Sequence, residues 1–368
     1  GGKTYVEAFT LSVNDLNENT APTILLSGST FLGTDINQYL GLQFVLSGDG
    51  STLAIGSPFK SSSNLNNNGA VNVYKNNQGA WTQIGQEIKG ITTDELAGTS
   101  LTISNDGTTL AFAAIPCGNG NSEDKEDRSG FVRVYQLKEN NWNQIGSDLP
   151  ITRNPDDYFL ENIVQDNIAL SNDGSVIAIG SDFNDSSSVG TDIETQPYVD
   201  VYQNINNTWV RVGEAIRTPI ETLPDESNPH IPLISWVWSG FWDRVGRLDS
   251  ITSLEISNDG SVVAFGSTGI RSSMFDGVGM TYIYQNSGGT WSQLGSTIFG
   301  EEQADFTGES HQLSLSGDGS TIAIGSNQNS GGFDTPYYED DSAGHVRVFK
   351  IINNEWSQVG NDIDGQKT

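Results

Sequence analysis

The stretch LSGDGSTLAIGS at residues 46–57 decides the fold, because close copies of it recur along the chain. The copies are ISNDGTTLAFAA at 103–114, LSNDGSVIAIGS at 170–181, ISNDGSVVAFGS at 256–267 and LSGDGSTIAIGS at 315–326. Each has an apolar run, a Ser-x-Asp-Gly turn and a second apolar run that ends in small residues. Asp-Gly between two such runs predicts a β-hairpin, because glycine tolerates positive φ and aspartate can cap the turn with its side chain.

The aspartates of the five turns are either catalytic or structural. They are Asp49, Asp106, Asp173, Asp259 and Asp318. A catalytic residue is rarely needed five times in one chain, so we assign these carboxylates to turn structure.

Two more strands follow each hairpin. The third strands are expected at 69–76, 130–137, 198–204, 280–286 and 344–351. The fourth strands are expected at 81–88, 142–149, 209–216, 291–298 and 356–363. Four short antiparallel strands in each repeat, with hairpins that begin at residues 46, 103, 170, 256 and 315, predict an all-β protein, a five-bladed β-propeller of four-stranded antiparallel blades.

Aromatic residues at fixed positions of the repeat are expected to pack between neighbouring blades. They are Trp81, Trp142, Trp209, Trp291, Trp356, Tyr74, Tyr135, Tyr202, Tyr284 and Phe349. A glycine follows each tryptophan four residues later, at 85, 146, 213, 295 and 360. We expect these glycines to mark a bulge or a close backbone approach.

The repeat resembles known propeller blades of the WD40 and FG-GAP types. It is most similar to the form LSxDGxxxAIGxP…GxVRVY…WxQxGxxIxG of large surface proteins and adhesins of marine microbes, and this resemblance covers residues 28–365. FG-GAP blades often hold calcium in the hairpin turn through flanking acidic residues. Those residues are missing from the S-x-D-G turns here, so calcium binding is not carried over to them.

Residues 1–22 resemble the end of a cadherin-like domain and its linker, V-x-D-x-N-D-N-x-P. The matching positions are Val13, Asp15, Asn17, Asn19 and Pro22. The resemblance implies that Asp15, Asn17 and Asn19 are calcium ligands, and the alternative is a plain polar linker. We therefore expect a cadherin-like end at 1–22 and a propeller at 23–368, in a monomeric module of a longer chain that begins here with Gly-Gly.

The strand that closes the ring is left open by the sequence. GSTFLG at 28–33 matches GSTIFG at 295–300, so a fourth-strand sequence also precedes the first hairpin. Either this early copy (Thr23–Gly33) or the late copy (Trp356–Asp364) can complete the last blade, or both can. A larger ring is the remaining alternative.

The long loops are expected on one face of the propeller. Loops between second and third strands share a face with loops that lead to the next blade. Here they are long and unlike one another, at 58–68, 115–129, 182–197, 268–279 and 327–343, and at 89–98, 150–162, 217–249 and 299–310. Binding sites lie preferentially on variable loops held by a rigid framework, so we expect the binding surface on this loop face.

The loop 217–249 contains a cluster of aromatic residues outside the repeat. The candidate ligand-binding residues are Trp236, Trp238, Phe241, Trp242, Asp243 and Arg244, together with Tyr337 and Tyr338 of another loop. Aromatic rings on a loop can stack on sugars or anchor a peptide. The alternative is that these aromatics form a small core of their own.

Acidic loops are candidate calcium sites, because carboxylate oxygens suit this hard cation. The candidate ligands are Asp124, Asp127, Asp182, Asp185, Asp340 and Asp341. The alternative is a solvated acidic surface. Calcium is thus the expected cofactor.

Charge and composition exclude several classes of partner. The chain has 46 acidic and 17 basic residues and a net charge of −29, which argues against nucleic acid and anionic membrane surfaces. No apolar run is long enough to span a bilayer, so membrane insertion is not expected. With one cysteine, no disulfide can form within the chain.

Catalysis finds little support in the sequence. Only Asp166 and Glu255 lie on or next to the inner strands, where propeller glycosidases place their acids. The histidines, His230, His311 and His345, are scattered without metal-ligand spacing. We therefore expect no enzyme, but a secreted or cell-surface adhesion module that binds a glycan. The alternatives are a protein- or peptide-binding propeller, a spacer without a ligand and, less favoured, a glycoside hydrolase.

Overall fold

The computed structural model describes twelve segments of the chain, which contain only strands, turns and loops. They are residues 12–13, 23–26, 29–33, 38–62, 64–114, 130–151, 167–181, 197–217, 251–267, 279–301, 313–326 and 344–365. The all-β prediction is therefore confirmed for the described residues. None of them forms a helix of the length and apolarity that a membrane span requires.

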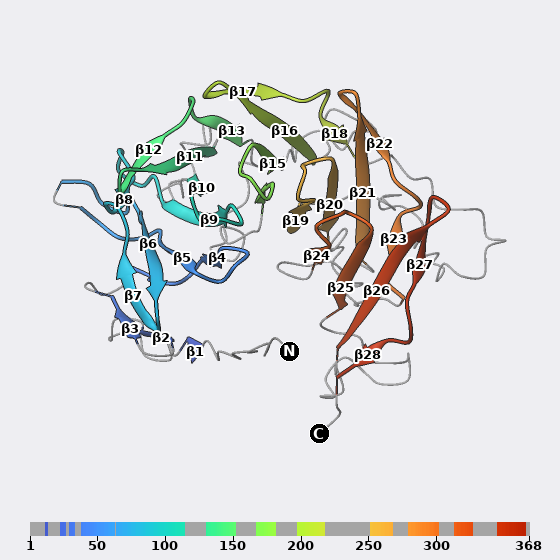
Figure 1. The fold of residues 1–368 in the computed structure, drawn as a ribbon, viewed down its shortest axis with the longest axis horizontal. Helices are drawn as coiled ribbons and strands as arrows, with labels where there is room; N and C mark the ends of the chain where they lie inside the picture. Colours follow the sequence, from blue (N-terminus) through green and yellow to red (C-terminus); the bar gives the residue numbers. More distant parts are fainter. Residues whose placement is uncertain are drawn as a thin grey trace, which may run out of the picture. The chain divides into compact units, whose positions relative to one another are not determined.

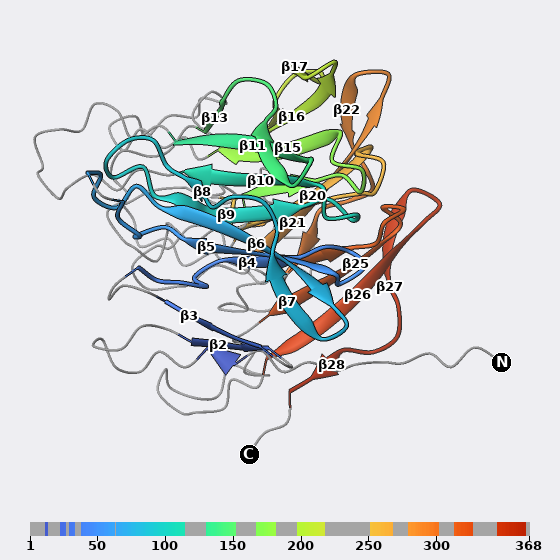
Figure 2. The same ribbon diagram turned by 60° about the vertical axis from the view of Figure 1, so that its left-hand side comes forward.

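Five sheets follow the predicted blade order, and a sixth, separate sheet lies at the N-terminus (Figures 1 and 2). The N-terminal sheet contains β1 (Ser12–Val13), β2 (Thr23–Leu26) and β3 (Ser29–Leu32). Blade 1 contains β4 (Phe44–Leu46), β5 (Thr52–Ser57), β6 (Ala70–Asn77), β7 (Ala80–Gln83) and β8 (Ile88–Lys89). Blade 2 contains β9 (Ala97–Ile103), β10 (Thr109–Ala114), β11 (Gly130–Lys138), β12 (Asn141–Gln144) and β13 (Leu149–Ile151).

The remaining three blades repeat this order. Blade 3 contains β14 (Ile168–Leu170), β15 (Val176–Ser181), β16 (Tyr198–Ile205), β17 (Thr208–Arg211) and β18 (Ile216–Arg217). Blade 4 contains β19 (Ser253–Ile256), β20 (Val262–Ser267), β21 (Met280–Ser287), β22 (Thr290–Gln293) and β23 (Ile298–Phe299). Blade 5 contains β24 (Leu313–Leu315), β25 (Thr321–Ser326), β26 (His345–Ile352), β27 (Glu355–Gln358) and β28 (Ile363–Asp364).

The chain divides into two compact units, which we describe separately. Unit 1 spans Gly1–Pro150 and Tyr158–Val164, and unit 2 spans Ile151–Asp157 and Gln165–Thr368. Blades 1 and 2 belong to unit 1, apart from Ile151 at the end of β13, and blades 3, 4 and 5 belong to unit 2. The boundary expected between residues 22 and 23 stays a prediction.

The fourth strand of each blade is broken, whereas the sequence pattern predicts one continuous strand. In blade 1, β7 pairs with the end of β6 (Tyr74 opposite Gln83), and β8 pairs with its start (Val71 opposite Ile88). Residues 84–87 therefore lie opposite only Asn72 and Val73. Gly85 lies in this bulge with a φ of 69°, a conformation that side chains other than glycine rarely adopt. The predicted bulge at the repeated glycine is confirmed, and it explains the break.

The five Ser-x-Asp-Gly turns are closed by one repeated hydrogen-bond network. In blade 1 the Ser47 hydroxyl donates to Asp49 at 2.6 Å, the Ser51 amide donates to Asp49 at 2.9 Å, and the Thr52 amide donates to Ser47 Oγ at 2.9 Å. The same three bonds recur in the other four turns. The Ser47 and Ser51 bonds lower the pKa of Asp49 to about 2. The assignment of these aspartates to turn structure is confirmed.

Apolar side chains fill the seam between neighbouring blades within each unit. Between blades 1 and 2 the buried cluster includes Val73 and Ile88 on one side and Phe112 and Trp142 on the other. Trp142 also donates its indole N–H to the carbonyl oxygen of Ile84 at 3.0 Å. Matching bonds link blades 3 and 4 (Trp291 to Val212, 2.8 Å) and blades 4 and 5 (Trp356 to Leu294, 2.7 Å). The prediction that tryptophans pack between blades is confirmed for these three.

The two extra fourth-strand sequences have different positions. The late copy pairs within its own blade, because β27 and β28 both bond to β26. The early copy contains β3, whose Phe31 packs on the Leu53–Ile55 cluster of blade 1, with its ring 4.4 Å from that of Tyr74. Ile298 of β23 packs in the same way on Phe349 and Trp356 of blade 5. The early copy therefore covers blade 1 as the last strand of a preceding blade would.

Candidate functional site

The candidate residues named from the sequence lie outside the described residues. This holds for Trp236, Trp238, Phe241, Trp242, Asp243, Arg244, Tyr337 and Tyr338, and for Asp15, Asn17, Asn19, Asp124, Asp127, Asp182, Asp185, Asp340 and Asp341. These assignments stay predictions. Among the residues weighed for catalysis, Glu255 is described and lies half-buried on β19, whereas Asp166, His230 and His311 are not described.

One position of the third strand, Asn72 in β6, lies near the loop face in each blade. The third-strand residues at this position are Asn72, Arg133, Asp200, Tyr282 and Arg347, and their partners after the bulge are Glu87, Asp148, Ala215, Thr297 and Asp362. These side chains lie close to the ends of the strands from which the long loops start. They belong to the described part of the loop face.

In blade 1 the acidic member of the pair is neutralised by lysines. Glu87 accepts hydrogen bonds from Lys60 and from Asn72, and its second oxygen lies 3.2 Å from Lys89 Nζ. Burial raises the pKa of Glu87, but the Lys60 and Asn72 bonds outweigh it, so its pKa lies below the ordinary value. This carboxylate is therefore ionised and paired with two lysines.

In blade 2 the arginine is sealed between two carboxylates. Arg133 donates Nε to both oxygens of Asp148 at 3.1 Å and Nη1 to Glu95 at 2.5 Å. The side chains of Arg133 and Glu95 are 5% and 1% exposed, and the ring of Phe131 lies 4.3 Å from the guanidinium. The site is a buried ion pair, which suits structure rather than ligand binding.

Blade 3 has an acid at the third-strand position and the uncharged Ala215 at the partner position. Asp200 stands on the third strand and accepts a bond from Arg211 at 2.5 Å and one from the Tyr202 hydroxyl at 3.4 Å. Burial and the Asp200 charge raise the pKa of Tyr202 to about 12. Tyr202 is therefore a neutral donor at physiological pH.

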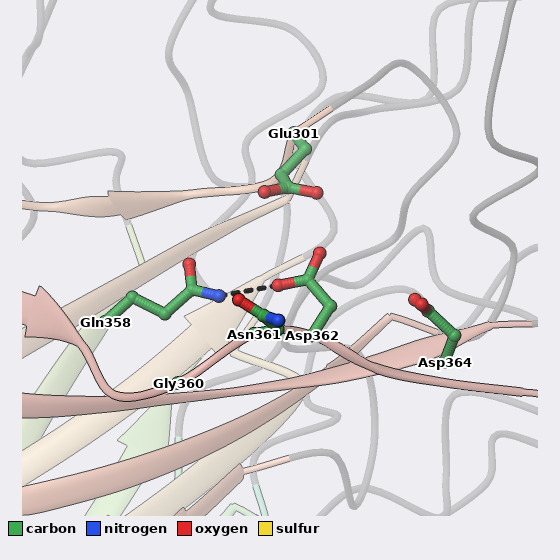
Figure 3. A pocket seen from close by; sticks show the side chains of 6 residues that line it. All are labelled: Glu301, Gln358, Gly360, Asn361, Asp362 and Asp364. Atoms are coloured by element: carbon green, nitrogen blue, oxygen red, sulfur yellow. Dashed lines mark hydrogen bonds between the residues drawn. The ribbon is translucent and has the colours of Figure 1, made fainter.

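Blade 5 carries an open hollow instead of a sealed pair (Figure 3). The hollow has a volume of about 480 Å³ and is lined by Glu301, Gln358, Gly360, Asn361, Asp362 and Asp364. Gln358 donates a hydrogen bond to Asp362 at 2.5 Å. The lining side chains are carboxylates and amides, so the hollow suits a ligand rich in hydroxyl groups or a cation.

A histidine and two carboxylates meet beside this hollow. One ligand atom from each of Glu301, His345 and Asp362 lies within 4.8 Å of the other two. His345 is 5% exposed, Asp362 is half-buried and Glu301 is exposed. Arg347 Nη1 lies 3.5 Å from Glu301, and Arg347 Nη2 donates to the carbonyl oxygen of Phe299 at 2.8 Å.

Sequence reasoning missed this group because it treated the histidines as scattered. The histidines show no metal-ligand spacing along the sequence, but the fold brings His345 next to residues 44 positions before it (345 − 301) and 17 after it (362 − 345). An alignment of the blades carries the signal. His345 occupies the position of Ala70, Phe131, Tyr198 and Met280 in the other blades.

Comparison with known proteins identifies the fold but no family. No protein-family model and no curated protein matches the sequence. The periplasmic gluconolactonase PpgL of Pseudomonas aeruginosa is similar in structure, at 14% identity and a TM-score of 0.50, with 96% of this chain and 82% of that chain covered. Together with the five antiparallel sheets, the structural matches confirm a five-bladed β-propeller.

Two further structures match at lower TM-scores. Hydrazine synthase of Kuenenia stuttgartiensis is 15% identical with a TM-score of 0.45, and covers 89% of this chain and 68% of its own. The Dos1 propeller is 12% identical with a TM-score of 0.48, and covers 95% of this chain and 66% of its own.

The expectation that the chain is not an enzyme is corrected by the match to the gluconolactonase. The gluconolactonase shares the fold over nearly the whole chain and is an enzyme by name. A propeller of this kind can thus carry an active site, so neither the fold nor the sparse acids of the inner strands exclude catalysis.

Proposed function

We propose that the chain is a ligand-binding module of an exported cell-surface adhesin, and that it recognises a glycan through the loop face. The hollow of blade 5 is the observation that supports this best, because it lies where two of the long loops begin and is lined by polar side chains. Asp362, Asn361 and Gln358 together offer acceptors and donors for sugar hydroxyls.

The contrast between the two faces also supports this proposal. Within each of the five Ser-x-Asp-Gly turns the serine hydroxyl donates a hydrogen bond to the aspartate, so the turn offers few free polar groups to a ligand. The long loops instead contain acidic and aromatic residues that the repeat does not require. In this proposal Trp236, Trp238 and Trp242 stack on sugar rings, and calcium orders the acidic loops around Asp124, Asp182 and Asp340.

The proposed cellular context rests on the cadherin-like resemblance of residues 1–22 and on the charge of the chain. A cadherin-like end at 1–22, with Asp15, Asn17 and Asn19 as calcium ligands, would make the propeller one module of a long surface protein. The net charge of −29 suits a salty medium that contains calcium.

A glycan array tests the proposal directly. The full chain should bind a defined set of glycans in calcium and lose this binding in EDTA. Gln358→Ala should weaken binding about fivefold, as expected for one lost hydrogen bond. Gln293→Ala is the matched control, because Gln293 holds the same position in blade 4, outside the hollow. Binding to deglycosylated surface proteins with no glycan bound would contradict the proposal, as would cleavage of the arrayed glycans in place of retention.

A further inference from the structure

We propose that Glu301, His345 and Asp362 bind one divalent transition-metal ion, of which Zn²⁺ is the best fit. The site lies at the seam between blades 4 and 5, within unit 2. It is distinct from the calcium sites expected in the acidic loops, and it does not depend on the glycan proposed above.

The strands of blade 5 place the three side chains on one side of the sheet. His345 begins β26 and lies opposite Asp364 of β28 in the antiparallel pair. Asp362 precedes Asp364 by two residues and therefore shares its side of the sheet, because side chains alternate along an extended chain. That side faces blade 4, against which Phe349 of β26 packs. Glu301 arrives from blade 4, two residues after β23 ends at Phe299.

The distances require only a small movement to form a metal site. Zinc binds nitrogen and oxygen at about 2.0–2.2 Å, so the ligand atoms of a tetrahedral site lie about 3.3–3.5 Å apart. The three ligand atoms here lie within 4.8 Å of one another. His345 is buried and fixed by its strand, whereas the exposed Glu301 and half-buried Asp362 can rotate toward it.

The charge of the site matches a divalent cation. Glu301, Asp362 and Asp364 contribute −3 and Arg347 contributes +1, which leaves −2 around the hollow. In blade 2 the counterpart of Asp362 is Asp148, whose two oxygens both accept a hydrogen bond from Arg133 Nε. In blade 5 Arg347 Nε has no hydrogen-bond partner among the described residues, and Asp362 instead lies near Glu301. A cation between these two carboxylates would remove their repulsion.

The ligand types select the class of metal. An imidazole with two carboxylates suits Zn²⁺ and its first-row neighbours, whereas Ca²⁺ and Mg²⁺ prefer oxygen ligands alone. Three protein ligands leave at least one coordination position of a tetrahedral ion open toward the hollow. Water or an oxygen atom of a bound molecule can occupy this position.

Titration of the metal-stripped full chain with Zn²⁺ and Co²⁺ tests the site. Calorimetry should show one Zn²⁺ site, and bound Co²⁺ should give the visible absorption of a tetrahedral site. His345→Phe, which installs the blade 2 residue, should abolish this site, and Asp362→Asn should weaken it at least tenfold. Glu214→Gln is the control, since Glu214 is an exposed acid after the bulge of blade 3.

The outcomes are distinct from those of the glycan test, because no glycan is present. His345→Gln serves as a second variant, and circular dichroism verifies that each variant is folded. Unchanged Zn²⁺ stoichiometry and affinity in folded His345 variants would overturn the proposal. Tighter binding of Ca²⁺ than of Zn²⁺ at a site that depends on His345 would overturn the choice of metal.

Discussion

At the same repeat positions, ion pairs close the seam between blades 1 and 2, whereas the seam between blades 4 and 5 is open. In the first, Arg133 is enclosed by Asp148 and Glu95, and its three hydrogen bonds to them are 3.1 Å or shorter. In the second, Arg347 lies 3.5 Å from Glu301, and its Nε has no hydrogen-bond partner among the described residues. Asp362 accepts a bond from Gln358, as Asp148 does from Gln144. The first seam is sealed, and the second has an open acidic hollow.

Two local differences cause this contrast. Glu95 accepts hydrogen bonds from two amides of its own loop, Ile91 at 2.6 Å and Thr92 at 2.9 Å. Glu301 lies two residues after the end of β23 and is 41% exposed. Phe131 covers the arginine of blade 2, and the polar His345 replaces it in blade 5. A few side chains at the loop ends of the outer strands thus decide whether a blade is purely structural or can bind a ligand.

Replacement of the two arginines should give the largest difference in the free energy of unfolding between the two seams. Arg133→Met leaves Glu95 buried without its cation, which typically costs about 3–5 kcal/mol. Arg347→Met leaves Glu301 free to be hydrated and should cost about 1–2 kcal/mol, mainly for the lost bond to the Phe299 carbonyl. Urea denaturation of both variants measures the difference in the free energy of unfolding. Equal losses would show that the two seams are equally closed.

The bulge glycines provide a second matched pair. A Cβ on Gly85 would lie 2.5 Å from Trp142 Cδ1, and a Cβ on Gly295, its counterpart in the seam between blades 4 and 5, would lie 2.6 Å from Trp356 Cδ1. A Cβ on Gly360 of blade 5 would meet no atom of the described residues within 4 Å. Gly85 and Gly360 both have positive φ, of 69° and 78°. Gly360→Ala should therefore cost only the backbone strain, about 1–2 kcal/mol, and Gly85→Ala should cost about 1–3 kcal/mol more through overpacking. Thermal unfolding of the two variants measures this; a larger loss for Gly360→Ala would contradict the packing at the first seam.

The sequence predicted the features that depend on local chemistry and failed where distant segments meet. The hairpin turns, the seam tryptophans and the bulge glycines could be predicted because each depends on a repeated local pattern. The glycine pattern indicated a bulge, but not that this bulge divides the fourth strand into two, with residues 84–87 opposite only Asn72 and Val73. The group around His345 was missed because Glu301 belongs to the preceding blade, and only packing of the blades brings it there.

The seam tryptophans should respond alike, because this part of the two seams is the same. Trp142 donates to Ile84 at 3.0 Å, and Trp356 donates to Leu294 at 2.7 Å. Substitution by phenylalanine keeps most of the apolar contact and removes one hydrogen bond, which should cost about 1 kcal/mol or slightly more in either seam. Urea denaturation of Trp142→Phe and Trp356→Phe measures both losses. A difference of more than about 1 kcal/mol would extend the contrast between the seams from the polar residues to the core.

The smallest effect is expected at the turn aspartates, because these carboxylates are exposed. The Ser316 hydroxyl and the Ser320 amide lower the pKa of Asp318 to about 2. In blade 2, burial raises the pKa of Asp106, but the Ser104 and Thr108 bonds outweigh it and lower the pKa below the ordinary value. A carboxylate with a lowered folded-state pKa stabilises the fold above its unfolded pKa of 3.8, and this contribution is lost as the pH falls through the folded value.

Asp318→Asn and Asp106→Asn should therefore differ most from the natural protein above pH 4 and least near pH 2. Urea midpoints measured at several pH values between 6 and 2 give this difference for each turn. For Asp318 the difference in stability should persist until the pH approaches about 2, the folded-state pKa of this carboxylate. A difference that grows as the pH falls would mean that the protonated carboxyl, and not the carboxylate, closes the turn. That result would contradict the assignment of the five aspartates to closing the hairpin turns as carboxylates.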